Sequence, residues 1–283
     1  MKNNIFYSCA WVGLLMLVLS SISWSQEKSS ASVVPTPPAN AMPTAVSTPS
    51  AETGAKSGAP LKSYPRYGHV HVDGPYVALT FDDGPSATLT PRLLDILKEH
   101  HAKATFFIIG ERAQRNSEIL AREVQEGHEV GNHTWDHITI TKLSDAQFDE
   151  EIQKTNKLIT DATGEKPTLF RPPGGAINRH FVEILANKYG MKSILWSVDP
   201  LDWKRPGSSV VAQRLIAGTT PGAITISHDI KLGTIEAMPE VLDALQAKGY
   251  KFVTVSELIA LETKAPATAP TVKSVASTQK KGS

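Results

Sequence analysis

Strand-like and helix-like segments alternate from about residue 76 to the region after residue 256, and this alternation limits the possible folds more than any other feature. Each of seven apolar strand-like segments is followed by a segment with helical periodicity or a helix-start signal. Such alternation is typical of parallel strands joined by right-handed helical crossovers. The predicted strands span residues 76–81, 104–109, 129–131, 169–171, 193–197, 223–227 and 252–254.

Local signals mark the ends of several predicted helices. Ser144 and Gln147 predict a capping box for a long helix, and Thr90 with Pro91 predicts the start of the helix after the first strand. Residues 68–74 predict a hairpin arm that leads into the first strand. Further helices are predicted at residues 116–126, 178–189 and 234–248, and from residues 208 and 256 onward.

Two α/β architectures fit this order of elements, an open doubly wound sheet and a barrel. No glycine-rich dinucleotide loop or phosphate loop follows the first strand, which argues against a nucleotide-binding open sheet. We therefore predict a barrel of the TIM type with slightly fewer than eight units. In such barrels the chemistry lies on the loops at the C-terminal ends of the strands.

Composition and terminal segments restrict where the chain works and what it binds. The net charge of +1 gives no reason to expect a nucleic-acid partner, and the only cysteine, Cys9, lies at the N-terminal apolar segment, which excludes disulfides and cysteine catalysis elsewhere. Residues 1–25 have the pattern of a secretory signal, with an apolar run well short of the roughly 20 residues of a membrane-spanning helix. We expect export to the periplasm, the cell envelope or the extracellular space; an uncleaved anchor is the alternative.

The segments on both sides of the alternating region predict disorder. Residues 26–63 are rich in Pro, Ser, Thr and Ala, and residues 262–283 have the same character with added lysines. Residues 64–261 are left as a single catalytic domain, held away from the N-terminus by the first of these segments. We expect a monomer with no stable membrane span after signal cleavage.

Charged and imidazole side chains gather at the ends of the predicted strands. Taken alone, Asp82 and Asp83 before Gly84 and Pro85 read as turn formers, and each of the other residues reads as part of a surface salt bridge. Their convergence at one rim of a barrel predicts an active site instead. The residues are Asp82 and Asp83 after the first strand, His133 and His137 after the third, Arg171 at the fourth, Asp199 and Asp202 after the fifth, and His228 at the sixth.

His133 and His137 are spaced to lie on one side of a helical turn and to share a cation. With Asp83 they predict a site of two histidines and one carboxylate, which suits zinc in a hydrolase and also ferrous iron in an oxygenase. A hydrolytic metal site further needs a base and an acid. Asp82 is the natural base and His228 the natural acid.

Two further groups complete this predicted chemistry. Arg171 can hold Asp82 ionised and oriented, and Asp199 or Asp202 can keep His228 protonated.

Five segments together resemble the motifs of polysaccharide deacetylases with the NodB homology domain, carbohydrate esterase family 4. The resemblance spans about residues 76–255 and implies a distorted (β/α)7 barrel. In order, the segments are TFDDG at 80–84, HTWDH at 133–137, RPPGG at 171–175, DPLDW at 199–203 and ITISH at 224–228.

The resemblance also implies roles for individual residues. Asp82 would be the base with Arg171 as its partner, and His228 the acid with Asp202 as its partner. The implied metal ligands are Asp83, His133 and His137, and the implied substrate-binding residues are Pro173, Gly174, Gly175, Trp203 and Ile226.

Two residues depart from the family pattern. Gly174 stands where an aromatic residue is common, so an aromatic wall is lost while a backbone N–H contact to the oxyanion can remain. Ile226 replaces the usual leucine, which is a mild change in the wall that faces the acetyl methyl group.

From these residues we expect an exported hydrolase that removes N-acetyl groups from N-acetylglucosamine residues of a polysaccharide, most simply peptidoglycan. We expect Zn²⁺ as the metal, with Co²⁺ or another divalent ion as alternatives. A chitin-oligosaccharide deacetylase and an acetylxylan esterase are the enzymatic alternatives. A catalytically inactive wall-binding module is the alternative from another class, and the intact Asp82 and His228 argue against it.

Overall fold

The computed structural model describes residue 64 and residues 66–263. The predicted signal at 1–25, Cys9, the predicted linker at 26–63 and residues 264–283 of the predicted tail lie outside the described residues. Within the described part, no helix combines the length and apolarity needed to cross a membrane. The domain extends slightly past the predicted boundary at 261, because Glu262 forms an antiparallel bridge with Val72 and the Thr263 N–H donates to the carbonyl of His71.

Seven strands form the main sheet, in the order β1-β7-β6-β5-β4-β3-β8, and all of its pairings are parallel. A parallel bridge between Val198 and Thr225 joins the chain just after β7 to the chain just before β8, so the sheet curls until its two sides meet. This confirms the distorted α/β barrel. The strands are β1 (Arg66–Tyr67), β3 (Leu79–Asp82), β4 (Ala104–Ile108), β5 (Glu129–Asn132), β6 (Leu169–Phe170), β7 (Lys192–Ile194) and β8 (Ser227–His228).

The last predicted strand is present but pairs separately. β9 (Lys251–Phe252) lies parallel to β2 (Tyr76–Val77) in a two-stranded sheet. The carbonyls of Pro75 and Val77 accept hydrogen bonds from the N–H groups of Lys251 and Val253. Tyr76 and Ala78, the alternate residues, form their backbone hydrogen bonds with residues 222–225 instead. Because alternate residues of a strand use opposite edges, β9 follows the edge that β4 also uses, and β8 closes directly on β3.

The predicted hairpin arm at 68–74 is wrong. β1 instead pairs in parallel with β7, and His69 and Val72 form isolated bridges with Ala223 and Glu262. The segment therefore contacts elements far away in sequence, a pairing that local alternation and a turn signal cannot show.

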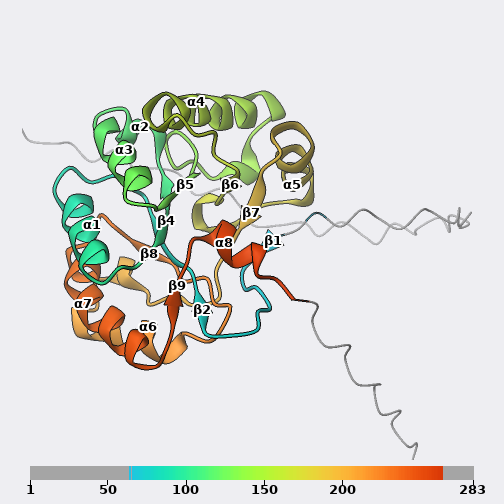
Figure 1. Cartoon of the computed structure of the whole chain (residues 1–283). Helices are drawn as coiled ribbons and strands as arrows, with labels where there is room; N and C mark the ends of the chain where they lie inside the picture. Colours follow the sequence, from blue (N-terminus) through green and yellow to red (C-terminus); the bar gives the residue numbers. More distant parts are fainter. Residues whose placement is uncertain (1–63, 65, 264–283) are drawn as a thin grey trace, which may run out of the picture. The chain divides into compact units, whose positions relative to one another are not determined.

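Helices lie around the outside of the curled sheet (Figure 1). The capping box of Ser144 and Gln147 is confirmed at the start of α4. α1 begins before the predicted Thr90, with Thr88 at the N-cap, and the Thr90 hydroxyl bonds to Ser86 and Asp229 instead of capping the helix. The helices are α1 (Leu89–Glu99), α2 (Gly110–Ala113), α3 (Ser117–Gln125), α4 (Asp145–Thr163), α5 (Arg179–Ile184) with the π-helical turn η3 (Leu185–Tyr189), α6 (Ser208–Gly218), α7 (Leu232–Ala247) and α8 (Val255–Ala260), with short 3-10 turns η1 (Ile140–Lys142), η2 (Pro173–Gly175) and η4 (Asp202–Lys204).

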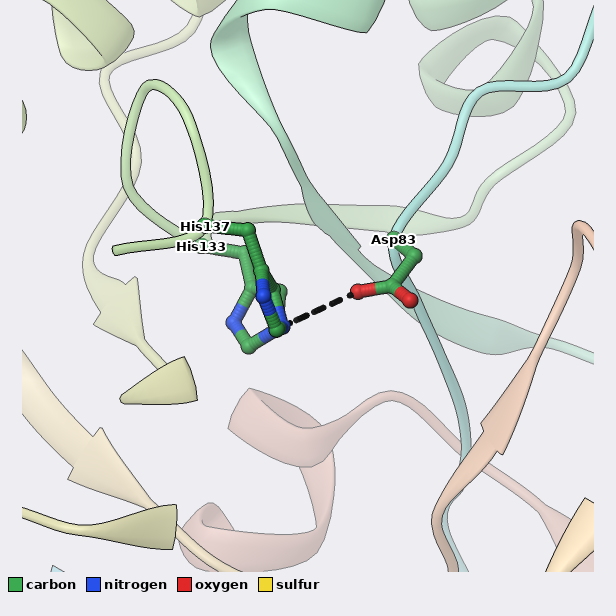
Figure 2. Close-up of side chains that lie close together, drawn as sticks. All are labelled: Asp83, His133 and His137. Carbon is green, nitrogen blue, oxygen red and sulfur yellow. Dashed lines mark ion pairs between the residues drawn. The ribbon is translucent and has the colours of Figure 1, made fainter. Parts of the chain in front are cut away.

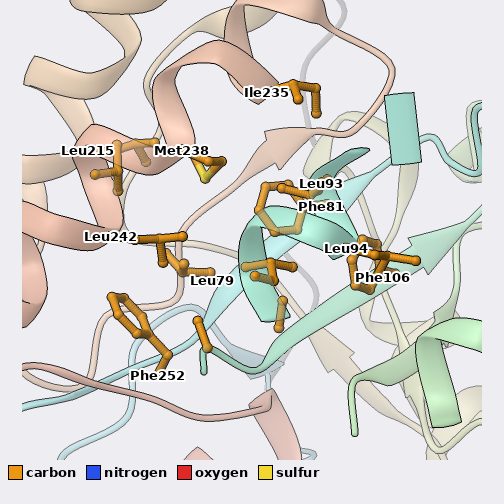
Figure 3. Close-up of a cluster of buried hydrophobic side chains, with 14 of the residues drawn as sticks. Leu79, Phe81, Leu93, Leu94, Phe106, Leu215, Ile235, Met238, Leu242 and Phe252 are labelled. Atoms are coloured by element: carbon orange, nitrogen blue, oxygen red, sulfur yellow. The ribbon is translucent and has the colours of Figure 1, made fainter. Parts of the chain in front are cut away.

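The largest hydrophobic cluster packs β3 and β4 against α1, α6 and α7 (Figure 3). Leu79 and Phe81 of β3 are almost fully buried in this cluster, together with Leu93 of α1 and Met238 of α7. Burial of one such side chain contributes about 1.5–3 kcal/mol. The strand that ends in Asp82 is therefore anchored along its length, which fixes the position of the carboxylate at its end.

Glu123 of α3 is an exception in this apolar surrounding. It is fully buried, and neither carboxyl oxygen has a hydrogen-bond partner among the described residues. Burial, and secondly the charge of Asp229, raise the pKa of Glu123 well above its ordinary value of 4.5. Since the unfolded chain ionises near that ordinary value, the folded protein loses stability as the pH rises above it.

We expect Glu123→Gln to raise the free energy of unfolding by about 1–3 kcal/mol at pH 8, because the amide cannot ionise, and to have little effect near pH 4.5. Urea denaturation at both pH values measures the difference. Glu118→Gln, at an exposed position of the same helix, is the matched control. Equal stability of Glu123→Gln and wild-type protein at pH 8 would contradict the assignment.

Candidate active site

The structure brings the predicted reactive residues to one rim of the barrel. Because the strands of the main sheet are parallel, their C-terminal ends share that rim. Asp82 and His228 are register partners across β3 and β8, which makes them close neighbours. The positions are Asp82 at the end of β3 with Asp83 next, His133 and His137 after β5, Arg171 after β6, Asp202 at the start of η4 and His228 at the end of β8.

Asp83, His133 and His137 form a compact group of candidate metal ligands. One ligand atom from each residue lies within 4.8 Å of the others. Asp83 Oδ1 is 3.6 Å from His133 Nε2 and 3.4 Å from His137 Nε2, and Figure 2 shows both imidazoles directed at this carboxylate. Among the described residues, no other such group of three is present.

The two histidines do not share a helical turn, contrary to the prediction. They lie in a loop after β5 in which Thr134 and His137 have positive φ angles of 68° and 64°. Asn132 Oδ1 accepts from the Thr134 N–H at 2.8 Å, and Thr134 Oγ1 accepts from the His137 N–H at 3.0 Å. Side-chain hydrogen bonds of this kind stabilise unusual backbone conformations, so the loop replaces helical geometry in bringing the rings together.

Several features of these side chains fit a bound cation. The buried His133 uses Nδ1 to donate to the Arg171 carbonyl at 2.7 Å, so its Nε2 presents a lone pair to Asp83. Asp83 Oδ1 is itself buried and accepts no hydrogen bond within the described chain. Burial lowers the pKa of His133 to about 3, which keeps the ring neutral as a metal ligand must be. The donor set of two imidazoles and one carboxylate suits zinc.

Asp82 is buried and faces Arg171 instead. Arg171 Nη1 donates to Asp82 Oδ1 at 2.7 Å and to the Thr80 hydroxyl, while Nη2 donates to the Leu195 carbonyl at 3.0 Å. Burial raises the pKa of Asp82 above its ordinary value, although Arg171 and His228 oppose that effect. A carboxylate that is held ionised by an arginine and is more basic than usual is suited to take a proton.

His228 makes a matching pair with Asp202. Its Nδ1 donates to Asp202 Oδ1 at 2.7 Å, and Asp202 Oδ2 accepts from the His228 N–H and from the Thr234 hydroxyl at 2.6 Å. Burial alone would lower the pKa of His228, but the hydrogen bond and charge of Asp202 outweigh it, and the pKa is raised. For Asp202, burial is outweighed by its bonds from His228, and its pKa is lowered. Each partner therefore favours the charged form of the other, an imidazolium beside a carboxylate.

Of the two candidate partners of His228, the structure selects Asp202. Asp199 Oδ1 instead accepts from the Leu201 N–H at 2.7 Å and closes a turn. Sequence reasoning missed Thr234 and the Asn132 side chain, and only Asn132 had a local signal, as an Asn directly before His133.

The residues implied as substrate contacts occupy separate places around this group. Gly174 and Gly175 in η2 have positive φ angles of 63° and 76°, and a Cβ on Gly175 would come within 2.9 Å of the Trp196 ring. Trp203 is 52% exposed, Ile226 only 6%, and Pro173 is buried. Substrate contact by any of these five residues stays a prediction.

Comparison with known proteins identifies the family to which the chain belongs. The polysaccharide deacetylase family model matches residues 69–194. The chain is 40% identical over 188 residues to a peptidoglycan-N-acetylglucosamine deacetylase of Bacillus cereus, covering 65% of this chain and 87% of that protein. The chain belongs to the polysaccharide deacetylase family. Asp202 and His228 lie beyond the residues that the family model matches, so their assignment depends on the geometry given above.

Two further relatives of this deacetylase family show how far the similarity reaches. The peptidoglycan-N-acetylglucosamine deacetylase PgdA of Listeria monocytogenes is 45% identical over 182 residues, but the match covers 64% of this chain and only 38% of that protein. The crystal structure of the Bc1960 peptidoglycan N-acetylglucosamine deacetylase superposes with a TM-score of 0.67 and 31% identity, covering 71% of this chain and 96% of that one.

We expect His137→Ala to lose most of its bound zinc after dialysis against a chelator, because a site with three protein ligands weakens strongly when one is removed. Metal analysis by mass spectrometry measures the content. His180→Ala, at an exposed histidine of α5, is the control and should keep the metal. Full stoichiometric zinc in His137→Ala would show that the ligand set is wrong.

We expect Asp202→Asn to lower the pKa of His228, because the adjacent carboxylate stabilises the imidazolium by its hydrogen bond and its charge. An NMR titration of the His228 ring protons measures the pKa. Asp199→Asn is the matched control, since the Asp199 carboxylate bonds to Leu201 and not to His228. An unchanged His228 pKa in Asp202→Asn would refute the ion pair.

Proposed function

We propose that this chain is an exported, divalent-metal-dependent hydrolase that removes the acetyl group from N-acetylglucosamine residues of peptidoglycan. The observation that carries the proposal is the juxtaposition of Asp82 bonded to Arg171 and His228 bonded to Asp202 as register partners beside a candidate metal triad. Amide hydrolysis needs a base for water and an acid for the departing nitrogen, and this pair supplies both.

Asp83, His133 and His137 would hold the metal, for which we propose Zn²⁺, with Co²⁺ as an alternative. When bound, a divalent ion supplies a water of lowered pKa and polarises the acetyl carbonyl. Asp82 takes the proton of the attacking water, and Arg171 keeps that carboxylate in place while it does so. The low exposure of Asp82 excludes bulk water from this step.

His228 donates a proton to the sugar nitrogen as the C–N bond breaks. Asp202 holds Nδ1 through a hydrogen bond, so the proton on Nε2 is the one available for transfer. The Thr234 hydroxyl in turn fixes Asp202. We place the acetyl methyl group against Ile226, with Pro173, Gly174 and Gly175 on the other side and the exposed Trp203 under the sugar chain.

Peptidoglycan is favoured over chitin or acetylxylan as the substrate because the three similar proteins described above are named as peptidoglycan deacetylases. The chain spans only 38% of PgdA, so the activity and substrate of that whole protein come to this chain as part of the proposal. An exported enzyme suits a polymer of the cell wall. We propose that the signal at 1–25 directs this export and that the enzyme acts as a monomer.

Acetate release from three purified polymers tests the proposal. The zinc-loaded protein is incubated with peptidoglycan, chitin oligosaccharides and acetylated xylan, and the acetate is measured enzymatically. We expect release from peptidoglycan at the highest kcat/KM. Release from chitin or xylan alone would refute the substrate, and no release from any polymer would favour an inactive wall-binding module.

We expect His228→Ala to lose activity on an N-acetyl sugar by about a hundredfold or more, and to lose less on an activated aryl acetate. An amine leaves poorly unless it is protonated, whereas a phenolate leaves with little help. Parallel assays on the two substrates measure the contrast, with His180→Ala as the surface control. Equal losses on both substrates would contradict an acid role for His228.

A further inference from the structure

Asp229 is a buried acid that the proposed chemistry does not use. It directly follows His228 at the end of β8 and is 0% exposed. Its carboxyl oxygens lie against Gly84, where an added Cβ would come within 2.2 Å of Oδ2 and 2.6 Å of Oδ1. Since Gly84 directly follows Asp83, the carboxyl group next to the proposed acid packs on the backbone next to the proposed base and metal ligand.

Thr90 of α1 ties Asp229 to the turn after β3. The buried Thr90 hydroxyl donates its proton to Asp229 Oδ2 and accepts the Ser86 N–H at 2.8 Å. On the other side of the turn, the Gly84 carbonyl accepts from the Ile109 N–H at 3.1 Å. Residues 84–86 are therefore held between α1, β8 and the end of β4.

The backbone at Asp83 has an unusual conformation that this link can stabilise. Asp83 has a φ of 72°, in the left-handed region that residues other than glycine rarely adopt. Such a conformation persists only where the surroundings enforce it. An apolar side chain at 229 could pack against Gly84 without the cost of a buried carboxyl group, so filling space does not account for an acid at this place.

We propose that Asp229 is a positioning residue that acts through Thr90 and Gly84 to fix Asp82 and Asp83 at the end of β3 relative to His228 at the end of β8. The inference depends on the deacetylase function proposed above. Loss of the Asp229 carboxyl group would misplace the base and the acid without removing either one. Small misplacements of reacting groups lower the rate strongly.

Three threonine variants test the link. Thr90→Val keeps the shape and removes the hydroxyl, Thr90→Ser keeps the hydroxyl, and Thr155→Val makes the same change at a buried threonine whose hydroxyl has no hydrogen-bond partner among the described residues. We expect Thr90→Val to lower kcat about tenfold with little change in KM. Thr90→Ser and Thr155→Val should stay within about twofold of wild type, as expected when no hydrogen bond is lost.

Zinc affinity, measured by competition with a chelator, is the second readout, and Thr90→Val should bind more weakly than Thr155→Val because Asp83 is no longer held. If the wild-type protein releases no acetate, the proposed function fails, and zinc affinity alone decides the link. Equal behaviour of Thr90→Val and Thr155→Val would overturn it. If Thr90→Val does not fold, Asp229→Asn and Asp229→Leu replace it, and only the Leu variant, which lacks an acceptor for Thr90, should show the loss.

Discussion

The buried guanidinium of Arg171 is the group on which the arrangement of the site depends. It is fully buried, it lies 4.1 Å from the centre of the Phe107 ring, and its charge is balanced by Asp82 at 2.7 Å. A charge removed from water is tolerated only when it is paired and hydrogen-bonded. Loss of either partner leaves the other as an unpaired buried charge. The same residue fixes His133 through its carbonyl oxygen, so one side chain and its backbone organise both the proposed base and a candidate metal ligand.

This interaction separates the roles of two adjacent carboxylates. Asp82 Oδ2 lies 3.8 Å from His133 Nε2, nearly as close as Asp83 Oδ1 at 3.6 Å. Asp82, however, is bonded to Arg171, whereas Asp83 Oδ1 accepts no hydrogen bond from the described residues and faces two imidazoles. Strand geometry alone sends neighbouring side chains in different directions. By bonding to Asp82, Arg171 determines that Asp82, and not Asp83, is the carboxylate available to take a proton.

The sequence predicted the seven strands, most of the helices and the strand-end positions of the candidate site residues, because periodicity and strand-end position are local properties. It could not predict the edge on which β9 pairs, since that depends on which backbone groups of residues 75–78 remain available. The His133 and His137 loop was mistaken for a helical turn, because four-residue spacing does not reveal two positive φ angles. The Thr234–Asp202 and Thr90–Asp229 hydrogen bonds are tertiary contacts. Their partners are separated by 32 and by 139 positions in the sequence, so no local pattern records them.

The division of labour between Asp82 and Asp83 is tested most directly by anomalous scattering from crystals of the zinc-loaded protein, recorded on both sides of the zinc absorption edge. We predict one anomalous peak about 2.0–2.2 Å from a carboxylate oxygen of Asp83 and from Nε2 of His133 and His137, with Asp82 still bonded to Arg171. A peak ligated by Asp82, with Arg171 left unpaired, would contradict the account.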